Sequence, residues 1–173
     1  MISKKMEKAL NKQINLELFS AYIYAAMAVD FENKNLGGFA SWMKAQTQEE
    51  VGHAVRISDY VNERGGRVTL EAIDKPPATY QAPLKAFEAA LKHEQLVTKS
   101  INKLVDLAKE ESDHATVTFL QWFVSEQVEE EATADSIVQK LKLVGNAGPG
   151  IFMMDRELGQ RRASGGGSAE GEE

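Results

Sequence analysis

The chain has 173 residues, the size of one domain, with a formal net charge of −6 and no cysteine. The lack of cysteine excludes disulfides, thiolate zinc sites and cysteine catalysis. The negative charge disfavours nucleic-acid binding and suits a protein that handles cations. The N-terminus lacks the apolar run of a signal peptide, and uninterrupted apolar stretches such as residues 25–29 are too short to span a membrane. We therefore expect a cytoplasmic protein with no membrane and no nucleic-acid partner.

Long stretches rich in Ala, Leu, Glu, Lys and Gln alternate with short clusters of Gly, Pro and Asn, a pattern that predicts helices separated by breaks. In chain order, the expected elements are helices over residues 4–33, 37–64, 83–110 and 113–144, and a short fifth helix over 149–160. Residues 161–173 are rich in Gly, Ser and Glu and are expected to be disordered, so residues 1–160 form the predicted domain.

The breaks between the predicted helices determine their directions. In each long predicted helix, a series of mostly apolar residues recurs at alternating steps of three and four along one face, which we call the seam. Such a face is typical of a helix that packs into a bundle core. The first and third breaks are short, so each flanking pair is antiparallel. The connection over residues 65–82 can reach about 59 Å when extended, whereas a helix of 27 residues spans about 40 Å. It can therefore run the length of the bundle, which predicts an all-α four-helix bundle with one long crossover.

Four glutamates occupy seam positions that a plain bundle would fill with apolar side chains. They are Glu17, Glu50, Glu94 and Glu130, one on each long helix. A buried, unpaired carboxylate is costly, and no Lys or Arg lies on these seams within a turn of them. Two divalent cations would balance the four negative charges, so these residues predict a metal site.

The predicted ligands form two equivalent sets, Glu17 with Glu50 and His53, and Glu94 with Gln127 and Glu130. In each set the second residue follows the first by 33 positions, and the third follows the second by three. Two helical hairpins that each deliver one carboxylate and one i, i+3 pair form the di-iron carboxylate pattern, here with one Glu-x-x-His replaced by Gln-x-x-Glu. Oxygen and imidazole ligands suit Fe(II) and Mn(II) and accept Zn(II).

In a two-iron site, Glu50 is expected to bridge the metals. Glu17 and His53 would complete one iron site, and Glu94 and Glu130 the other.

Two aromatic residues are close in sequence to these ligands. Tyr24 lies seven residues after Glu17 on the same stripe, so it could hydrogen-bond a ligand or donate an electron during oxidation. Core packing alone is an equal alternative for this tyrosine. Trp122 could play a similar redox role.

A second acidic group flanks the first. Glu49, Glu126 and Glu129 each lie one position away from a seam residue. Like charges at i, i+3 on one helix are unfavourable without cations, so we interpret these residues, with Glu130, as a third metal site facing away from the core. A solvated acidic face is the alternative.

Residues 15–24, 48–53 and 126–131 together resemble the bacterial and archaeal non-haem ferritins, and the resemblance covers about residues 1–160. It implies a ferritin-like four-helix bundle in a homo-oligomeric shell of 24 subunits. It also implies ferroxidase activity, in which dioxygen or peroxide oxidises Fe(II) and ferric oxyhydroxide is stored. The family's ligand positions map onto the residues already given: two irons per subunit at Glu17, Glu50, His53, Glu94, Gln127 and Glu130, and the third site at Glu49, Glu126, Glu129 and Glu130.

Two departures from related families carry further expectations. Haem-containing bacterioferritins have a haem-ligating Met after the Glu of Glu-x-x-His, where this chain has Val51, and they carry a second Glu-x-x-His. No haem is therefore expected. Animal ferritins line their three-fold pores with acids at the start of the fourth helix, but residues 115–120 hold none, which leaves the iron entry route open.

Three alternatives fit the helical pattern less well. A rubrerythrin-like peroxidase usually carries a four-cysteine iron site, and this chain has no cysteine. A scaffolding bundle without chemistry would not place carboxylates on all four seams. A light-chain-like ferritin subunit, which assembles without an oxidation site, should lack Glu17, Glu50 or His53, and all three are present.

Overall fold

The computed structural model describes residues 1–145 and 147–160. The tail predicted to be disordered, residues 161–173, lies outside the described residues. The five helices are α1 (Lys4–Asn33), α2 (Gly37–Glu63), α3 (Pro83–Glu110), α4 (His114–Val144) and α5 (Gly148–Leu158). The all-α prediction is confirmed, and every predicted helix end lies within two residues of the observed one.

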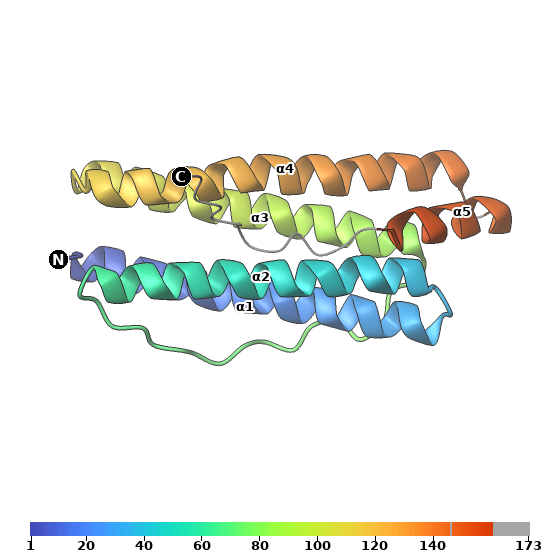
Figure 1. The fold of residues 1–173 in the computed structure, drawn as a ribbon, viewed down its shortest axis with the longest axis horizontal. Helices are drawn as coiled ribbons and strands as arrows, with labels where there is room; N and C mark the ends of the chain where they lie inside the picture. The colour runs from blue at the N-terminus through green and yellow to red at the C-terminus, as the bar shows by residue number, and fades with distance from the viewer. Residues whose placement is uncertain (146, 161–173) are drawn as a thin grey trace, which may run out of the picture.

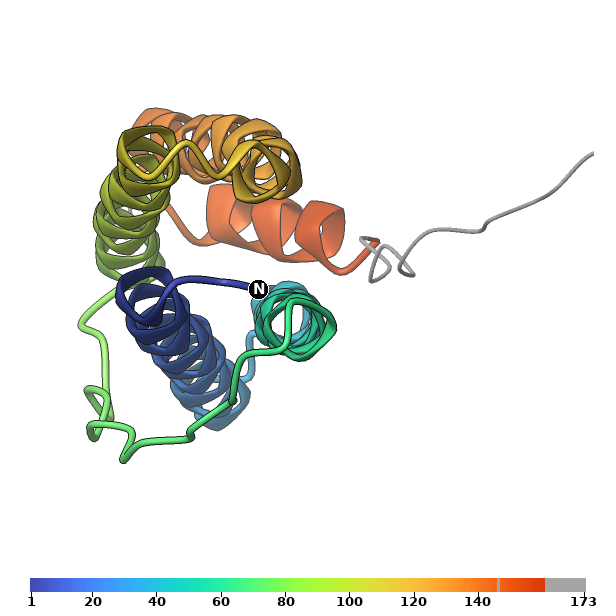
Figure 2. The same cartoon turned by 90° about the vertical axis from the view of Figure 1, so that its left-hand side faces the viewer.

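The helices form two antiparallel hairpins packed side by side. One hairpin is α1 with α2 and the other is α3 with α4, and the two are joined across the α1–α3 contact (Figure 1). The connection from α2 to α3 runs along the length of the bundle, as its spacing predicted (Figure 1). Figure 2, which views the bundle from its end, shows the four long helices around a common centre, with the crossover outside α1 and α2.

Two asparagines on α1 hold the crossover against the bundle. The Asn11 amide donates to the carbonyl oxygen of Arg67 at 2.9 Å, and its side-chain oxygen accepts from the Thr69 backbone N–H at 2.7 Å. One turn later, the Asn15 amide donates to the carbonyl oxygen of Ala72 at 3.1 Å. Backbone groups that form no regular ladder are thereby satisfied, so the crossover is tied to α1 along its length.

The core consists of two apolar clusters with a polar layer between them. The first cluster includes Phe31, Phe39 and Phe87 at the α5 end, and the second includes Leu10 and Phe123 at the opposite end. In each long helix, the predicted ligands come between the segments that belong to these clusters. A fully buried Leu or Phe contributes about 1.5–3 kcal/mol, so the apolar clusters offset the cost of the polar layer.

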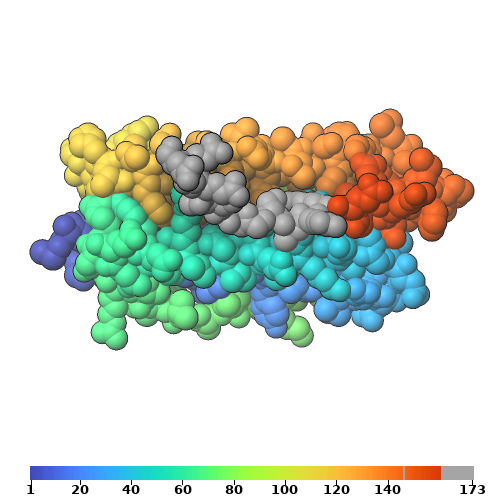
Figure 3. All heavy atoms as spheres, viewed as in Figure 1, coloured from blue at the N-terminus to red at the C-terminus, as the bar shows by residue number. Residues whose placement is uncertain are grey.

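The short helix α5 supplies the N-terminal cap that α2 lacks. The residue before α2, Leu36, makes no side-chain capping bond. The Asp155 carboxylate of α5 instead accepts from the backbone N–H groups of Gly38 at 2.8 Å and Phe39 at 3.0 Å. Figure 3 shows α5 seated against the ends of α2 and α4. An acceptor at this position satisfies two N–H groups that a helix start leaves open.

Of the helices in the described part of the chain, α1 is long and apolar enough to cross a membrane by length and composition. More than half of that apolar stretch, 56%, is buried inside the bundle, and α1 also buries the charged Glu17. The short run of residues 25–29 gave no sign of such a helix, because the apolar residues of α1 are interrupted by polar ones and spread over its whole length. In this structure α1 is a core helix of the bundle.

Candidate metal centre

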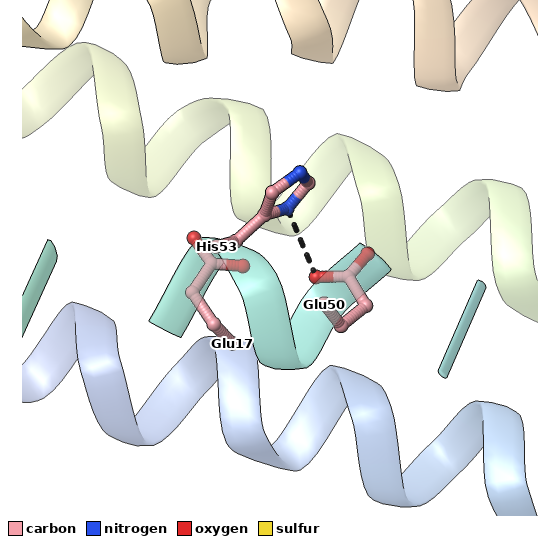
Figure 4. Close-up of side chains that lie close together, drawn as sticks. All are labelled: Glu17, Glu50 and His53. Atoms are coloured by element: carbon pink, nitrogen blue, oxygen red, sulfur yellow. Dashed lines mark ion pairs between the residues drawn. The ribbon is translucent and has the colours of Figure 1, made fainter. Parts of the chain in front are cut away.

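Three predicted ligands converge between α1 and α2. Figure 4 shows Glu17 reaching from α1 toward Glu50 and His53 on α2. One ligand atom from each residue lies within 4.8 Å of the others, and the three side chains are 1%, 2% and 6% exposed. The Nδ1 atom of His53 lies 3.4 Å from Oε2 of Glu50. Within residues 1–145 and 147–160, this is the one group of three or more His, Asp or Glu side chains that meets this distance.

The second set of predicted ligands is buried on α3 and α4. Glu94, Gln127 and Glu130 are 0%, 4% and 8% exposed. The Tyr24 hydroxyl donates to one oxygen of Glu94, and the Gln127 amide donates to the other at 3.3 Å. The Gln46 amide on α2 donates to Oε2 of Glu130 at 3.0 Å. The structure therefore brings the four seam carboxylates into one buried layer and ties α3 and α4 to the other hairpin.

Sequence reasoning missed two glutamines in this layer. Gln13 and Gln46 each lie four residues before a predicted ligand, Glu17 and Glu50 respectively, and are 1% and 0% exposed. The Gln13 amide donates to Oε1 of Glu17 at 2.8 Å. The available signal was a glutamine one helical turn before each glutamate ligand of the first hairpin, since residues four apart share a helix face.

Burial and mutual repulsion change how readily these carboxyls ionise. Burial, followed by the nearby Glu50 charge, raises the pKa of Glu17 well above its usual range. Burial, followed by the charges of Glu94 and Glu130, does the same to the pKa of Glu50. Burial also raises the pKa of Glu94. Protons can therefore neutralise this layer in the metal-free protein, and a bound cation would replace them.

These raised pKa values predict that the metal-free protein becomes less stable as pH rises. At pH values above the ordinary 4.5, the folded chain keeps protons on Glu17 and Glu50 that the unfolded chain has released. The free energy of unfolding should thus fall as pH increases from 4.5 through the raised pKa values. Urea unfolding at pH 5 and pH 8 with a chelator measures this slope. Glu50→Gln should flatten it, and a slope of opposite sign would contradict the assignment.

Three buried oxygens in the layer lack a hydrogen-bond partner. They are Oε2 of Glu17, Oε1 of Gln46 and Oε2 of Glu50. A buried acceptor without a partner costs about 1–3 kcal/mol, and more when it is charged. Two of these oxygens belong to the cluster with His53, so the donor set matches a divalent cation with oxygen and nitrogen ligands.

Both aromatic residues named from the sequence contact predicted ligands. Tyr24 is 1% exposed, and burial, followed by the Glu94 charge, raises its pKa well above 10. The Trp122 ring meets the His53 ring edge-on at 5.4 Å between centroids, and the Arg56 guanidinium lies 4.0 Å above the Trp122 ring. Tyr24 therefore contacts the predicted ligand Glu94 directly through its hydroxyl, while Trp122 packs against the imidazole of His53.

The predicted third site lies at the edge of this layer. Glu49 and Glu126 are half-buried and Glu129 is exposed. Among the described side chains, these three carboxylates do not form a group of three ligand atoms within 4.8 Å of one another. The third site therefore remains a prediction from the sequence.

The chain is similar to known proteins over most of its length. The profile of the ferritin-like domain family matches residues 7–144. A bacterial non-heme ferritin of Bacteroides fragilis is 48% identical over 161 residues, covering 93% of this chain and all of that protein. A bacterial non-heme ferritin of Campylobacter jejuni is 40% identical over 158 residues, covering 91% and 95%.

Solved structures give the same result. An open pore ferritin from the hyperthermophilic archaeon Archaeoglobus fulgidus superposes with a TM-score of 0.93 at 51% identity, covering 94% of this chain and all of that one. The helical bundle that holds the carboxylate layer is therefore a fold that known ferritins share. From the family match over most of its length and its identity to these relatives, the chain belongs to the ferritin family, as a ferritin of the prokaryotic non-haem type.

Proposed function

We propose that this protein stores iron and is a ferroxidase, which oxidises Fe(II) at the buried carboxylate layer. The observation that carries the proposal is the cluster of Glu17, Glu50 and His53, in which two buried carboxylate oxygens have no hydrogen-bond partner. Fe(II) is the substrate here. Fe(II) accepts both oxygen and imidazole ligands, and on binding it would replace the protons that this layer otherwise holds.

In the proposed reaction, two Fe(II) ions bind on either side of Glu50. Glu17 and His53 hold one ion, and Glu94 and Glu130 hold the other, with Gln127 hydrogen-bonded to Glu94 at 3.3 Å. Each Fe(II) gives up one electron. The two electrons and two protons convert dioxygen to hydrogen peroxide, or hydrogen peroxide to two water molecules. Because the layer is buried, the ions react away from bulk water.

Tyr24 would serve this reaction in two ways. Its hydroxyl donates to Glu94 and holds that carboxylate in place. It can also supply one of the two electrons in place of an Fe(II), with its phenolic proton as one of the two protons consumed. The next Fe(II) then reduces the tyrosyl radical, and the phenol regains a proton. The third iron site at Glu49, Glu126 and Glu129, with Glu130 shared, would receive ferric iron on its way to storage.

The proposed storage form is ferric oxyhydroxide inside a shell of 24 copies of this chain in the cytoplasm. Relatives that are named ferritins, and that this chain matches over nearly their whole length, support assembly and an iron cargo. Size-exclusion chromatography with light scattering measures the assembly directly, with 24 times 19.1 kDa as the expected mass.

Anomalous scattering at the iron edge, from crystals soaked in Fe(II) without oxygen, tests the site itself. The expected result is two peaks in the buried layer of each subunit, one beside His53 and one beside Glu94. Crystals in which iron occupies only surface positions would reject the proposed ferroxidase site.

The third site has its own prediction. Glu129→Ala should leave oxidation of the first two irons per subunit close to the wild-type rate but slow later additions several-fold, because ferric iron would leave the buried layer less readily. Stopped-flow absorbance with successive Fe(II) additions measures both phases. Glu63→Ala, an exposed acid on α2, is the matched control and should change neither phase. Equal rates in Glu129→Ala at every addition would support a solvated acidic face instead.

A further inference from the structure

A chain of three polar side chains leads from α3 into the metal centre. The Ser100 hydroxyl on α3 donates to Oε1 of Gln13 on α1 at 2.5 Å. The Gln13 amide nitrogen donates to Oε1 of Glu17 at 2.8 Å. Gln13 and Glu17 are each 1% exposed, and Ser100 is half-buried. These contacts cross the α1–α3 interface, away from the α2 residues that complete the cluster.

We propose that Ser100 and Gln13 are positioning residues that orient Glu17 as a metal ligand, an inference that rests on the proposed role of Glu17 in metal binding. A glutamine amide has one end that donates and one that accepts, and its two orientations differ only in which end faces which neighbour. A metal-bound Glu17 carboxylate is ionised and can only accept, so it requires the nitrogen of Gln13. This orientation turns the amide oxygen toward Ser100, whose hydroxyl can donate or accept and here donates to it.

Ser100 therefore holds Gln13 in the orientation that Glu17 requires. Without this hydroxyl, the amide oxygen loses its donor and Gln13 is fixed at one end only, so its nitrogen can move away from Glu17. With it, one oxygen of Glu17 is held by Gln13, while the other, Oε2, has no hydrogen-bond partner and is left for a cation. The Glu17 carboxyl group is thus held in one orientation before metal arrives, with Oε2 as the atom on which a cation can replace the proton, which lowers the cost of ordering the side chain on binding.

This arrangement differs from ordinary core packing. A packing role for position 100 would need only volume, and alanine would meet that need at a half-buried site. An orienting role needs the hydroxyl, so threonine should replace serine and alanine should not. Loss of such an outer hydrogen bond to a metal ligand typically weakens metal affinity by about 10- to 100-fold.

Cobalt(II) binding to the full-length, metal-free protein tests the inference, because Co(II) is not oxidised by air at this kind of site and its visible absorption reports its ligands. We expect Ser100→Ala and Gln13→Met to weaken Co(II) affinity at the buried site about 10-fold or more and to change the absorption band. Ser100→Thr should restore both. Ser58→Ala is the matched control, since the half-buried Ser58 hydroxyl donates only to the backbone oxygen of Ala54.

A Glu17→Ala variant distinguishes failure of the proposed metal site from failure of the positioning role of Ser100 and Gln13. If wild type and Glu17→Ala bind Co(II) alike, the proposed metal site fails. If Glu17→Ala loses the buried site while Ser100→Ala and Gln13→Met bind as wild type does, the site stands and the positioning role is overturned. If Ser100→Ala lowers affinity and Ser100→Thr fails to restore it, the hydroxyl is not the cause and the inference is likewise overturned. Circular dichroism and melting temperature, measured alongside, should stay unchanged in Ser100→Ala.

Discussion

Replacing Glu50 with alanine is expected to abolish rapid Fe(II) oxidation, lowering its initial rate at least about 100-fold. Glu50 is placed between the two ligand sets: His53 lies 3.4 Å from its Oε2 atom, and the charges of Glu94 and Glu130 act on it from the other hairpin. A residue that bridges two metals contributes to both sites, so its loss affects both ions at once. Stopped-flow absorbance after mixing metal-free protein with Fe(II) in air measures the rate.

The assembled protein should survive this substitution. Glu50 is 2% exposed and its Oε2 atom has no hydrogen-bond partner, so the substitution removes a buried polar group that is costly to bury and breaks no hydrogen bond of that oxygen. Light scattering should therefore report the wild-type mass. Glu63→Ala, the same change at an exposed position of α2, should keep the wild-type rate. An undiminished rate in Glu50→Ala would reject the buried layer as the site of oxidation.

Replacing Gly38 with alanine is expected to release α5 from the bundle. A Cβ atom at this position would lie 1.6 Å from the backbone oxygen of Asp155, a separation that the backbone must open to relieve. Undocking would break the cap that Asp155 provides to α2 and expose Met154 and Leu158, which are 4% and 6% exposed in the native fold. Loss of two buried apolar side chains costs about 3–6 kcal/mol.

Hydrogen exchange and urea unfolding measure this effect. Amides of α5 should lose protection in Gly38→Ala, and the unfolding midpoint should fall. Gly37→Ala is the matched control, because no heavy atom lies within 4 Å of a Cβ built at that neighbouring glycine. It should leave α5 protected, with stability equal to wild type or slightly higher, since alanine favours the helical state over glycine. A docked and protected α5 in Gly38→Ala would contradict the predicted clash.

Most of the helical architecture could be predicted because its signals are local. Glycine, proline and asparagine clusters mark where each helix ends, and the steps of three and four mark which face is buried. The same reasoning placed Glu17, Glu50, Glu94 and Glu130 in the core, and all four are buried. Even the direction of the crossover followed from the reach of an extended chain against the length of a helix.

Individual contacts between helices could not be predicted from the sequence pattern. The cap that Asp155 gives to α2 joins residues 116 and 117 positions apart, and the bond from Ser100 to Gln13 joins residues 87 apart. No period along the chain relates such pairs, because their distance depends on how each helix is rotated and how closely the helices approach. The sequence pattern therefore offered no way to pair Gln13 with Ser100 or Gln46 with Glu130.

The sequence by itself determined which residues face the core, how the helices are connected and which side chains could serve as ligands, since each of these depends on helical periodicity and chain reach. The tertiary structure alone decided that Glu17, Glu50 and His53 come within 4.8 Å of one another, and that α5 caps α2. It also decided that burial and neighbouring carboxylates raise the pKa values of Glu17 and Glu50. Those properties arise from distances between separate helices and from the removal of water, neither of which any single segment encodes.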